Sequence, residues 1–156
     1  MRNHIFVRVN GKTYIQRMKP TLVGPLLFVT FVITIGYLGT DSPWTLFAGL
    51  ILFAFYLTER MQWCRIYITE IKELPDEKIK ITYFDKDEVK EYIGEKKSFR
   101  LQRNSVWYKL GADKEQYLVF KDEQKGFTLR QYALGDWEDE MIDQVVNDWE
   151  PEKAPA

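Results

Sequence analysis

Few residues in this sequence have side chains suited to catalysis or tight metal binding. It has one histidine, His4, and one cysteine, Cys64, which excludes a histidine-rich metal cluster, a cysteine zinc site and a disulfide-stapled scaffold. A Ser-His-Asp constellation in a folded pocket is excluded for the same reason. Residues 85–88 (DKDE) have the acids of a calcium loop without its glycine or its terminal glutamate, so they predict a solvated hairpin turn. The sequence has no glycine-rich phosphate loop, and we expect no enzyme activity, no metal and no cofactor.

One local cluster of cations stands out, formed by Lys96, Lys97, Arg100 and Arg103. If the domain that holds them lies against the cytoplasmic leaflet, these side chains could bind lipid headgroups or a nucleotide phosphate. The alternative is an ordinary solvated strand face, because Glu95 and other acids nearby dilute the positive field. The sequence favours the solvated face and leaves the phosphate contact as a hypothesis.

Acidic residues gather near the C-terminus. Residues 136–152 contain eight acids and no base, whereas residues 1–21 carry five bases and no acid. Asp139, Glu140 and Asp143 lie on the polar face of a predicted amphipathic helix, and we expect this face to contact a basic partner protein or the chain's own N-terminal segment. The total charge is −1, so a nucleic-acid partner is not expected.

Two apolar runs separate these charged regions. Residues 22–38 and 44–57 contain no charged side chain, and the five residues between them have the glycine, aspartate and proline typical of a turn between helices. A soluble helical hairpin needs a polar face on each helix, and neither run has one, whereas a helix in hydrocarbon needs none. We therefore predict membrane spans at residues 22–39 and 44–60 joined by a turn at residues 40–43. A hairpin buried in a protein core is the alternative.

Basic residues around the two runs indicate the orientation of the hairpin. Five bases precede the first run and Arg60 and Arg65 follow the second, whereas the connecting turn has none. Because Lys and Arg accumulate on the cytoplasmic side, both termini should be cytoplasmic, in a multi-pass protein of the cell (inner) membrane surrounded by membrane lipids. A cleavable signal is rejected, since the first run is long for one and a second span follows immediately.

The N-terminal residues 1–21 are predicted to form a cytoplasmic β-hairpin. Apolar and polar residues alternate in residues 5–9 and 12–18, on either side of Asn10-Gly11, a pair that tolerates the positive φ angles of a two-residue turn. An isolated hairpin is marginal in water. We therefore expect this segment to dock onto the C-terminal domain or onto the anionic membrane surface.

Residues 64–150 have the pattern of a cytoplasmic β domain. Six or seven short runs with period-two alternation predict an antiparallel sandwich or barrel, with a break at Asn104-Ser105. Residues 136–149 predict a helix with Asp136 as its N-cap, and residues 151–156 a disordered tail. The apolar stripe of that helix should lie on the sheet and comprises Trp137, Met141, Ile142, Val145, Val146 and Trp149. The expected fold class is a membrane α-helical hairpin plus a mainly antiparallel β domain closed by a C-terminal amphipathic helix.

The order of these elements resembles that of the small bacterial membrane proteins with a PH-like (YcxB-like) domain. A short strand segment, a two-helix membrane hairpin, several antiparallel strands and a final amphipathic helix containing Trp carry this resemblance, which covers nearly the whole chain. It implies a PH-like barrel that serves as a non-catalytic binding or scaffolding module. The expected role is a docking module or accessory subunit of a larger membrane assembly, which binds a partner protein or lipid headgroups.

A second resemblance is to the two-transmembrane effectors of CBASS antiphage systems. It implies that the β-barrel senses a cyclic nucleotide and that the chain forms a homo-oligomer in the membrane. Those effectors are not expected to end in a long acidic amphipathic helix, which this chain has at residues 136–149. The accessory subunit is therefore the preferred role, and the ligand-gated effector is the alternative.

Overall fold

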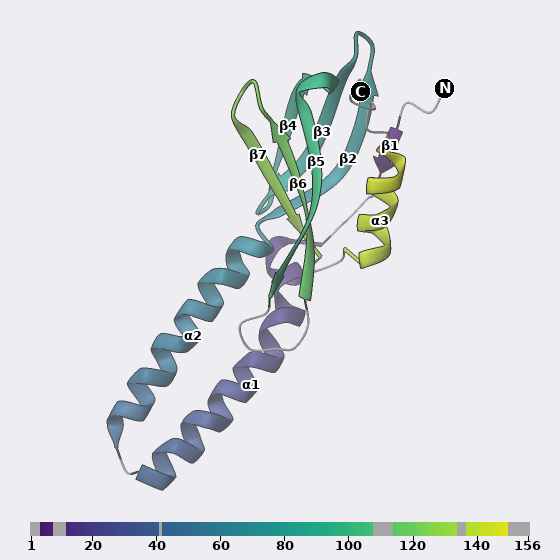
Figure 1. Cartoon of the computed structure of the whole chain (residues 1–156). Helices are drawn as coiled ribbons and strands as arrows, with labels where there is room; N and C mark the ends of the chain where they lie inside the picture. Colours follow the sequence, from purple (N-terminus) through teal and green to yellow (C-terminus); the bar gives the residue numbers. More distant parts are fainter. Residues whose placement is uncertain (1–3, 8–11, 41, 108–113, 134–136, 150–156) are drawn as a thin grey trace.

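The computed structural model describes residues 4–7, 12–40, 42–107, 114–133 and 137–149. Two long helices run side by side as a hairpin, and a β domain with a short helix stands at one end of that hairpin (Figure 1). The helices and strands are β1 (His4–Val7), α1 (Tyr14–Thr40), α2 (Pro43–Trp63), β2 (Ile66–Leu74), β3 (Lys78–Asp85), β4 (Glu88–Glu95), the 3₁₀ turn η1 (Lys96–Ser98), β5 (Phe99–Trp107), β6 (Lys114–Asp122), β7 (Phe127–Tyr132) and α3 (Asp139–Asp148).

The helices α1 and α2 confirm the predicted helical hairpin and extend it. Both are long and apolar enough to cross a membrane, and the most apolar windows of α1 and α2 are only 0% and 11% buried within the chain. The residues of each helix that are partly covered recur every three or four positions, so each helix presents one narrow stripe to the other. The remaining faces expose Leu, Ile, Val and Phe side chains, as expected for helices whose surroundings are hydrocarbon.

The N-terminal segment differs from its prediction. Residues 12–18, expected as the second strand of a hairpin, contribute the start of α1, which begins at Tyr14 rather than at residue 22. The reason is a capping box, in which the Gln16 N–H donates to Thr13 Oγ1 at 3.3 Å and the Thr13 N–H donates to Gln16 Oε1 at 2.9 Å. The strand β1 pairs with β2 instead, so the segment docks on the β domain as expected, although its Asn10-Gly11 turn lies outside the described residues.

The β domain has two antiparallel sheets, as predicted in its fold class. Their strand orders are β1-β2-β3-β4 and β5-β6-β7, and the sheets remain open, so the arrangement is layered rather than a closed barrel. Burial alternates along β3, with Ile79, Ile81 and Tyr83 facing the core. These side chains pack with Leu118 and Phe120 of β6 in the main hydrophobic core.

Two details of the β domain correct the sequence prediction. The break expected at Asn104-Ser105 does not occur, because β5 continues through both residues and pairs with Tyr117 and Gln116 of β6. Pairing with a neighbouring strand outweighs the turn preference of these two residues. The C-terminal helix is shorter than residues 136–149, although its apolar stripe packs on the sheets as predicted, with Trp137, Ile142, Val145 and Trp149 buried. The predicted cap Asp136 and tail 151–156 lie outside the described residues.

Candidate functional site

The four cations predicted as a phosphate cluster are not gathered around one site. Each forms an ion pair with an acid from a different part of the β domain, so their charges are compensated within the chain. The lipid or phosphate contact therefore stays a hypothesis. The pairs are Lys96–Glu73 at 2.5 Å, Lys97–Glu77 at 2.8 Å, Arg100–Glu123 at 3.8 Å, and Arg103–Asp143.

Two members of this cluster lie at the end of the domain that is remote from the hairpin. The strand β2 leaves α2 and rises for nine residues, which corresponds to about 26 Å, before the β2–β3 turn (Figure 1). The Lys96 N–H donates to the Glu77 carbonyl oxygen in that turn at 2.7 Å. Lys96 and Lys97 are thus far from the leaflet that the hairpin would enter, which weakens the expectation of a headgroup contact there.

The predicted acidic contact surface lies on α3, which packs beside β1, β5 and β6. Asp139 and Glu140 are exposed in the first turn of this helix. Asp143, by contrast, accepts a hydrogen bond from Arg103 on β5. The two sites predicted from charge thus meet in one ion pair, and of the three predicted acids Asp139 and Glu140 remain open to a partner.

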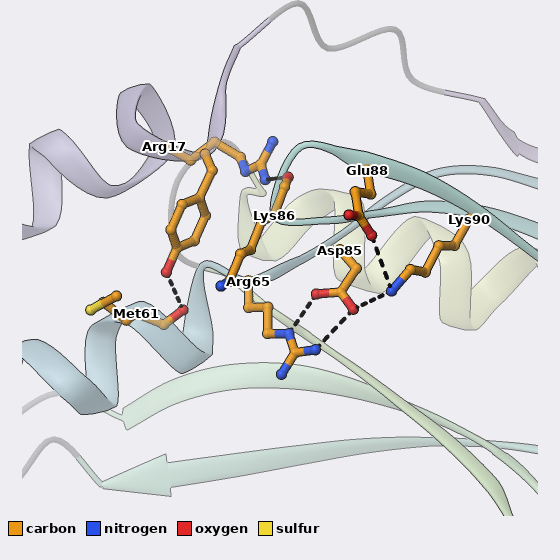
Figure 2. Close-up of polar contacts among 8 residues, drawn as sticks. Arg17, Met61, Arg65, Asp85, Lys86, Glu88 and Lys90 are labelled. Atoms are coloured by element: carbon orange, nitrogen blue, oxygen red, sulfur yellow. Dashed lines mark hydrogen bonds and ion pairs between the residues drawn. The ribbon is translucent and has the colours of Figure 1, made fainter.

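The sequence reasoning missed a polar cluster where the hairpin joins the β domain (Figure 2). Arg17, in the second turn of α1, is only 2% exposed. Its guanidinium donates to the carbonyl oxygens of Lys12 at 3.0 Å and Lys86 at 2.5 Å, and it lies 5.2 Å from the ring centroid of Tyr67 and 5.9 Å from that of Phe84. The carbonyls and the aromatic faces compensate for part of the cost of burying this charge.

The β3–β4 turn supplies the other half of the junction. Asp85 accepts two hydrogen bonds from Arg65, at 2.5 and 2.9 Å, and one from Lys90 at 2.8 Å (Figure 2). Hydrogen bonds from Arg65 hold the pKa of the Asp85 carboxyl well below its usual range; partial burial opposes this shift, and Lys90 adds to it. In the same turn, Asp87 Oδ1 accepts the Tyr14 N–H at 2.7 Å and so caps α1. The predicted hairpin turn at 85–88 therefore also clamps the first helix.

A second buried arginine lies on α2 beside an aromatic contact between this helix and the β domain. Arg60 is 2% exposed, and its guanidinium lies 4.9 Å from the ring centroid of Tyr56 and 4.8 Å from that of Trp63. Trp63 in turn stacks on Tyr132 of β7, with ring centroids 4.8 Å apart and planes inclined by 2°. The aromatic residues three or four positions from each arginine, including Tyr14 before Arg17, were the sequence signal that could have identified this junction.

A hydrogen bond from α2 to α1 uses a backbone carbonyl that a proline leaves without its usual donor. Pro25 lies inside α1 and has no N–H, so it cannot donate to the carbonyl oxygen of Thr21 four residues earlier. The hydroxyl of Tyr56 on α2 donates to that oxygen at 3.0 Å. A neighbouring helix thus satisfies the backbone group that the proline leaves without its usual partner, which an apolar environment requires.

One edge of the larger sheet is open. Asp85 and Glu88 flank the two-residue turn Lys86-Asp87 and therefore form a hydrogen-bonded pair. Hydrogen-bonded and non-hydrogen-bonded pairs alternate along antiparallel strands. The backbone N–H and C=O groups of even-numbered residues in β4 thus face β3, and those of odd-numbered residues face outward. In agreement with this alternation, the Ile93 carbonyl accepts a hydrogen bond from Lys125 at 3.2 Å rather than from β3. We call the outward-facing residues Val89, Glu91 and Ile93 the β4 edge.

The β4 edge also carries exposed apolar side chains. Within the described parts of the chain, all large hydrophobic residues that are strongly exposed lie in the two long helices except Val89 (63%) and Ile93 (47%). Behind them, Tyr92 donates to Asp122 at 2.9 Å; burial, followed by this hydrogen bond, raises the pKa of Tyr92 to about 12. Asp122 also accepts the N–H groups of Gln124 and Lys125, so β4 is tied firmly to the β6–β7 turn.

The described residues hold no group of three His, Cys, Asp or Glu side chains that could bind a metal ion. The described residues form an apolar helical hairpin, a junction held by polar and aromatic contacts, and an open strand edge. Comparison with known proteins finds no matching family model, no matching curated protein and no matching solved structure.

Proposed function

We propose that this chain is a membrane-anchored, non-catalytic docking module that serves as an accessory subunit of a larger membrane assembly. Its hairpin spans the cell (inner) membrane with both termini in the cytoplasm, and the β domain receives a partner protein. The support for anchoring is the pair of long apolar helices with basic flanks. The support for a fixed orientation is the junction, where Arg17, Trp63 and Asp85 join the hairpin to the sheets.

The observation that carries the docking role is the β4 edge. Outward-facing backbone groups and exposed Val89 and Ile93 occur together on one strand. An exposed strand edge of this kind is a ready template for another strand, and natural proteins normally blunt it with charge or cover it. We infer that an extended segment of a partner adds to β4, with main-chain hydrogen bonds supplying affinity and alternate side chains supplying specificity.

The charges around the β4 edge define the partner further. The strand carries the acids Glu88, Glu91 and Glu95 against the single base Lys90, which is engaged by Asp85. Glu91 is compensated by Lys80 at 2.7 Å, whereas Glu95 is exposed. A segment that alternates apolar and basic residues would cover the exposed apolar side chains of β4 and pair with its acids. The same preference for a basic partner follows from exposed Asp139 and Glu140 on α3.

The PH-like character of the domain belongs to this proposal. Antiparallel strands in sheets of four and three, followed by an amphipathic helix with buried tryptophans on either side of it, support the resemblance inferred from the order of elements. Such domains act as binding modules rather than enzymes, which agrees with a docking role. Headgroup binding through Lys96 and Lys97 is not part of the preferred mechanism, because these residues lie at the remote end of the domain.

A backbone substitution tests the β4 edge most directly. Glu91→Pro removes an outward N–H without disturbing the β3–β4 bonds, and proline is tolerated at such edge positions. Glu91→Ala removes the same side chain and keeps the N–H. We expect a partner that co-purifies with the full chain in mild detergent to be lost with Glu91→Pro and retained with Glu91→Ala. Circular dichroism would verify that both variants fold, and Val89→Lys with Ile93→Lys provides a second disruption.

Native mass spectrometry of the same preparations distinguishes the roles. A heteromeric complex that depends on the β4 edge supports the accessory subunit. Equal retention of the partner by Glu91→Pro and Glu91→Ala would show that the β4 edge is not the docking site. Loss of the partner when the charges of Asp139 and Glu140 are reversed would place the docking site on α3. A homo-oligomer that retains a nucleotide would contradict the accessory role and support the ligand-gated effector.

A further inference from the structure

The hairpin contains a groove between its two helices. It has a volume of about 540 Å³, within the range of small-ligand sites. The apolar part of the groove is lined mainly by aliphatic and aromatic side chains of both helices. These residues are Pro25, Phe28, Val29, Val32 and Ile33 of α1 and Gly49, Leu52 and Phe55 of α2.

The two helices contact each other at both ends of the groove. Near the connecting turn, a Cβ atom added to Gly49 would lie 2.3 Å from Ile33 Cγ1, so the helices already touch there. Near the β domain, the hydroxyl of Tyr56 is held on the Thr21 carbonyl at 3.0 Å. The helix axes are fixed at these two points, and Pro25 stands in the wall between them. The helices are thus held to each other at both ends of the groove.

The end of the groove nearest the β domain is polar and carries both charges. Arg60 and Glu59 line it together, with Thr58, Gln62 and Trp63 beside them. Arg60 is buried against the Tyr56 and Trp63 rings, and Glu59 is half-buried. One cation and one anion at the same mouth leave it without net charge. An amphiphile whose head contains an anionic and a cationic group matches this mouth better than one with a single charge.

The length of the groove corresponds to one leaflet. Ten residue positions separate Gly49 from Glu59 on α2, which is about 15 Å along the helix. This is half of the roughly 30 Å hydrocarbon core of a bilayer. When the hairpin is inserted in a bilayer, the apolar part of the groove lies in the hydrocarbon core. Its polar end lies at the membrane–water interface on the side of the β domain.

We propose that this groove binds one zwitterionic phospholipid of the leaflet on the side of the β domain. One acyl chain lies in the apolar part of the groove, the ammonium group of the headgroup contacts Glu59, and the phosphate lies at the mouth, attracted by the charge of the buried Arg60. The proposal rests on insertion of the hairpin into a bilayer, but not on docking at β4. A partner helix is the alternative occupant, and cross-linking from position 52, described below, tests for it.

Native mass spectrometry of the full chain in mild detergent tests this proposal, with the bound lipid identified by extraction. We expect one phospholipid per chain, with a zwitterionic headgroup. Leu52→Trp fills the groove and should reduce lipid retention at least tenfold, whereas Ile51→Trp, at a similarly exposed position that does not line the groove, should retain it. Val32→Trp repeats the blockade from α1, in case Leu52→Trp disturbs folding.

A separate substitution tests whether the groove prefers a zwitterionic headgroup. Glu59→Gln leaves Arg60 as the single charge at the mouth, so the ratio of zwitterionic to anionic lipid retained should fall severalfold. Absence of bound lipid from the unaltered chain, or equal retention by Leu52→Trp and Ile51→Trp, would overturn the proposal. So would a cysteine at position 52, in a Cys64→Ala background, that cross-links efficiently to another protein, because the groove would then hold a helix.

Discussion

The turn of the β3–β4 hairpin and the outer side of β4 differ in how their polar groups are used. At its turn, Asp85 binds Arg65 and Lys90, Asp87 caps α1, and the carbonyl of Lys86 accepts a hydrogen bond from Arg17. Along the outer side of β4, by contrast, apolar side chains are exposed and backbone groups face outward. The proposed docking edge and the attachment to the helical hairpin thus lie on different sides of one element, so a partner bound at β4 would leave the contacts of the turn in place.

The largest effect should follow from removing the arginine at the junction. Arg17→Ala leaves a cavity among aromatic rings and removes two hydrogen bonds to main-chain carbonyls, so we expect the free energy of unfolding to fall by about 3 kcal/mol. Arg17→Lys keeps the charge but not the forked geometry and should recover part of this loss. Denaturant unfolding of the full chain in mild detergent measures both. A loss below about 0.5 kcal/mol for Arg17→Ala would show that the junction is not the main attachment.

The next largest effect concerns the attachment between the helices. Tyr56→Phe leaves the Thr21 carbonyl without its donor and should cost about 1–2 kcal/mol. In a Pro25→Ala background the new N–H of residue 25 can bond to that carbonyl, so the same substitution should cost less than about 0.5 kcal/mol. A double-mutant cycle measures the difference. Equal costs in both backgrounds would refute the link between Pro25 and Tyr56.

The junction should also weaken in acid. The pKa of Asp85 is depressed in the folded chain, so its stabilising contribution is present above the unfolded pKa, about 3.9, and is lost as the pH falls below that value. We expect unfolding free energy measured from pH 7 to pH 3 to decline more steeply for the unaltered chain than for Asp85→Asn. Parallel pH profiles would show that the contacts of Asp85 contribute nothing to stability.

The smallest effect on stability is expected at the β4 edge. Val89→Ser and Ile93→Ser change exposed side chains with few contacts, so the free energy of unfolding should change by less than about 0.5 kcal/mol while partner binding weakens. Thermal unfolding, combined with co-purification of the partner, checks both halves of this expectation. A large loss of stability would mean that β4 is part of the core rather than a free edge.

The elements with strong periodicity were predictable from the sequence. The apolar runs predicted the helical hairpin, and period-two alternation predicted the strands. Apolar residues three or four positions apart predicted the stripe of the final helix. At the start of α1, however, two local signals conflicted. Asn10-Gly11 favoured a hairpin through residue 18, whereas the capping box of Thr13 and Gln16 favoured a helix, and the helix formed because it extends directly into the apolar run.

The candidate sites were less predictable, because charge in a sequence does not reveal its partner. Lys96 looked available beside Lys97, yet its partner Glu73 lies 23 residues away on β2. Arg17 looked like a topology determinant, although Tyr67 and Phe84 from the sheets surround it. The outward face of β4 depends on which strand lies beside it, and strand order is fixed by tertiary pairing rather than by local pattern.

Labelling of single cysteines in intact cells tests most directly whether the hairpin spans the membrane. In a Cys64→Ala background, Ser42→Cys places a thiol at the turn between the helices, and Val89→Cys places one on the β domain. We expect a membrane-impermeant maleimide to label Ser42→Cys in intact cells and Val89→Cys only after lysis. Equal labelling of the two positions, or recovery of the chain in the soluble fraction without detergent, would contradict the account.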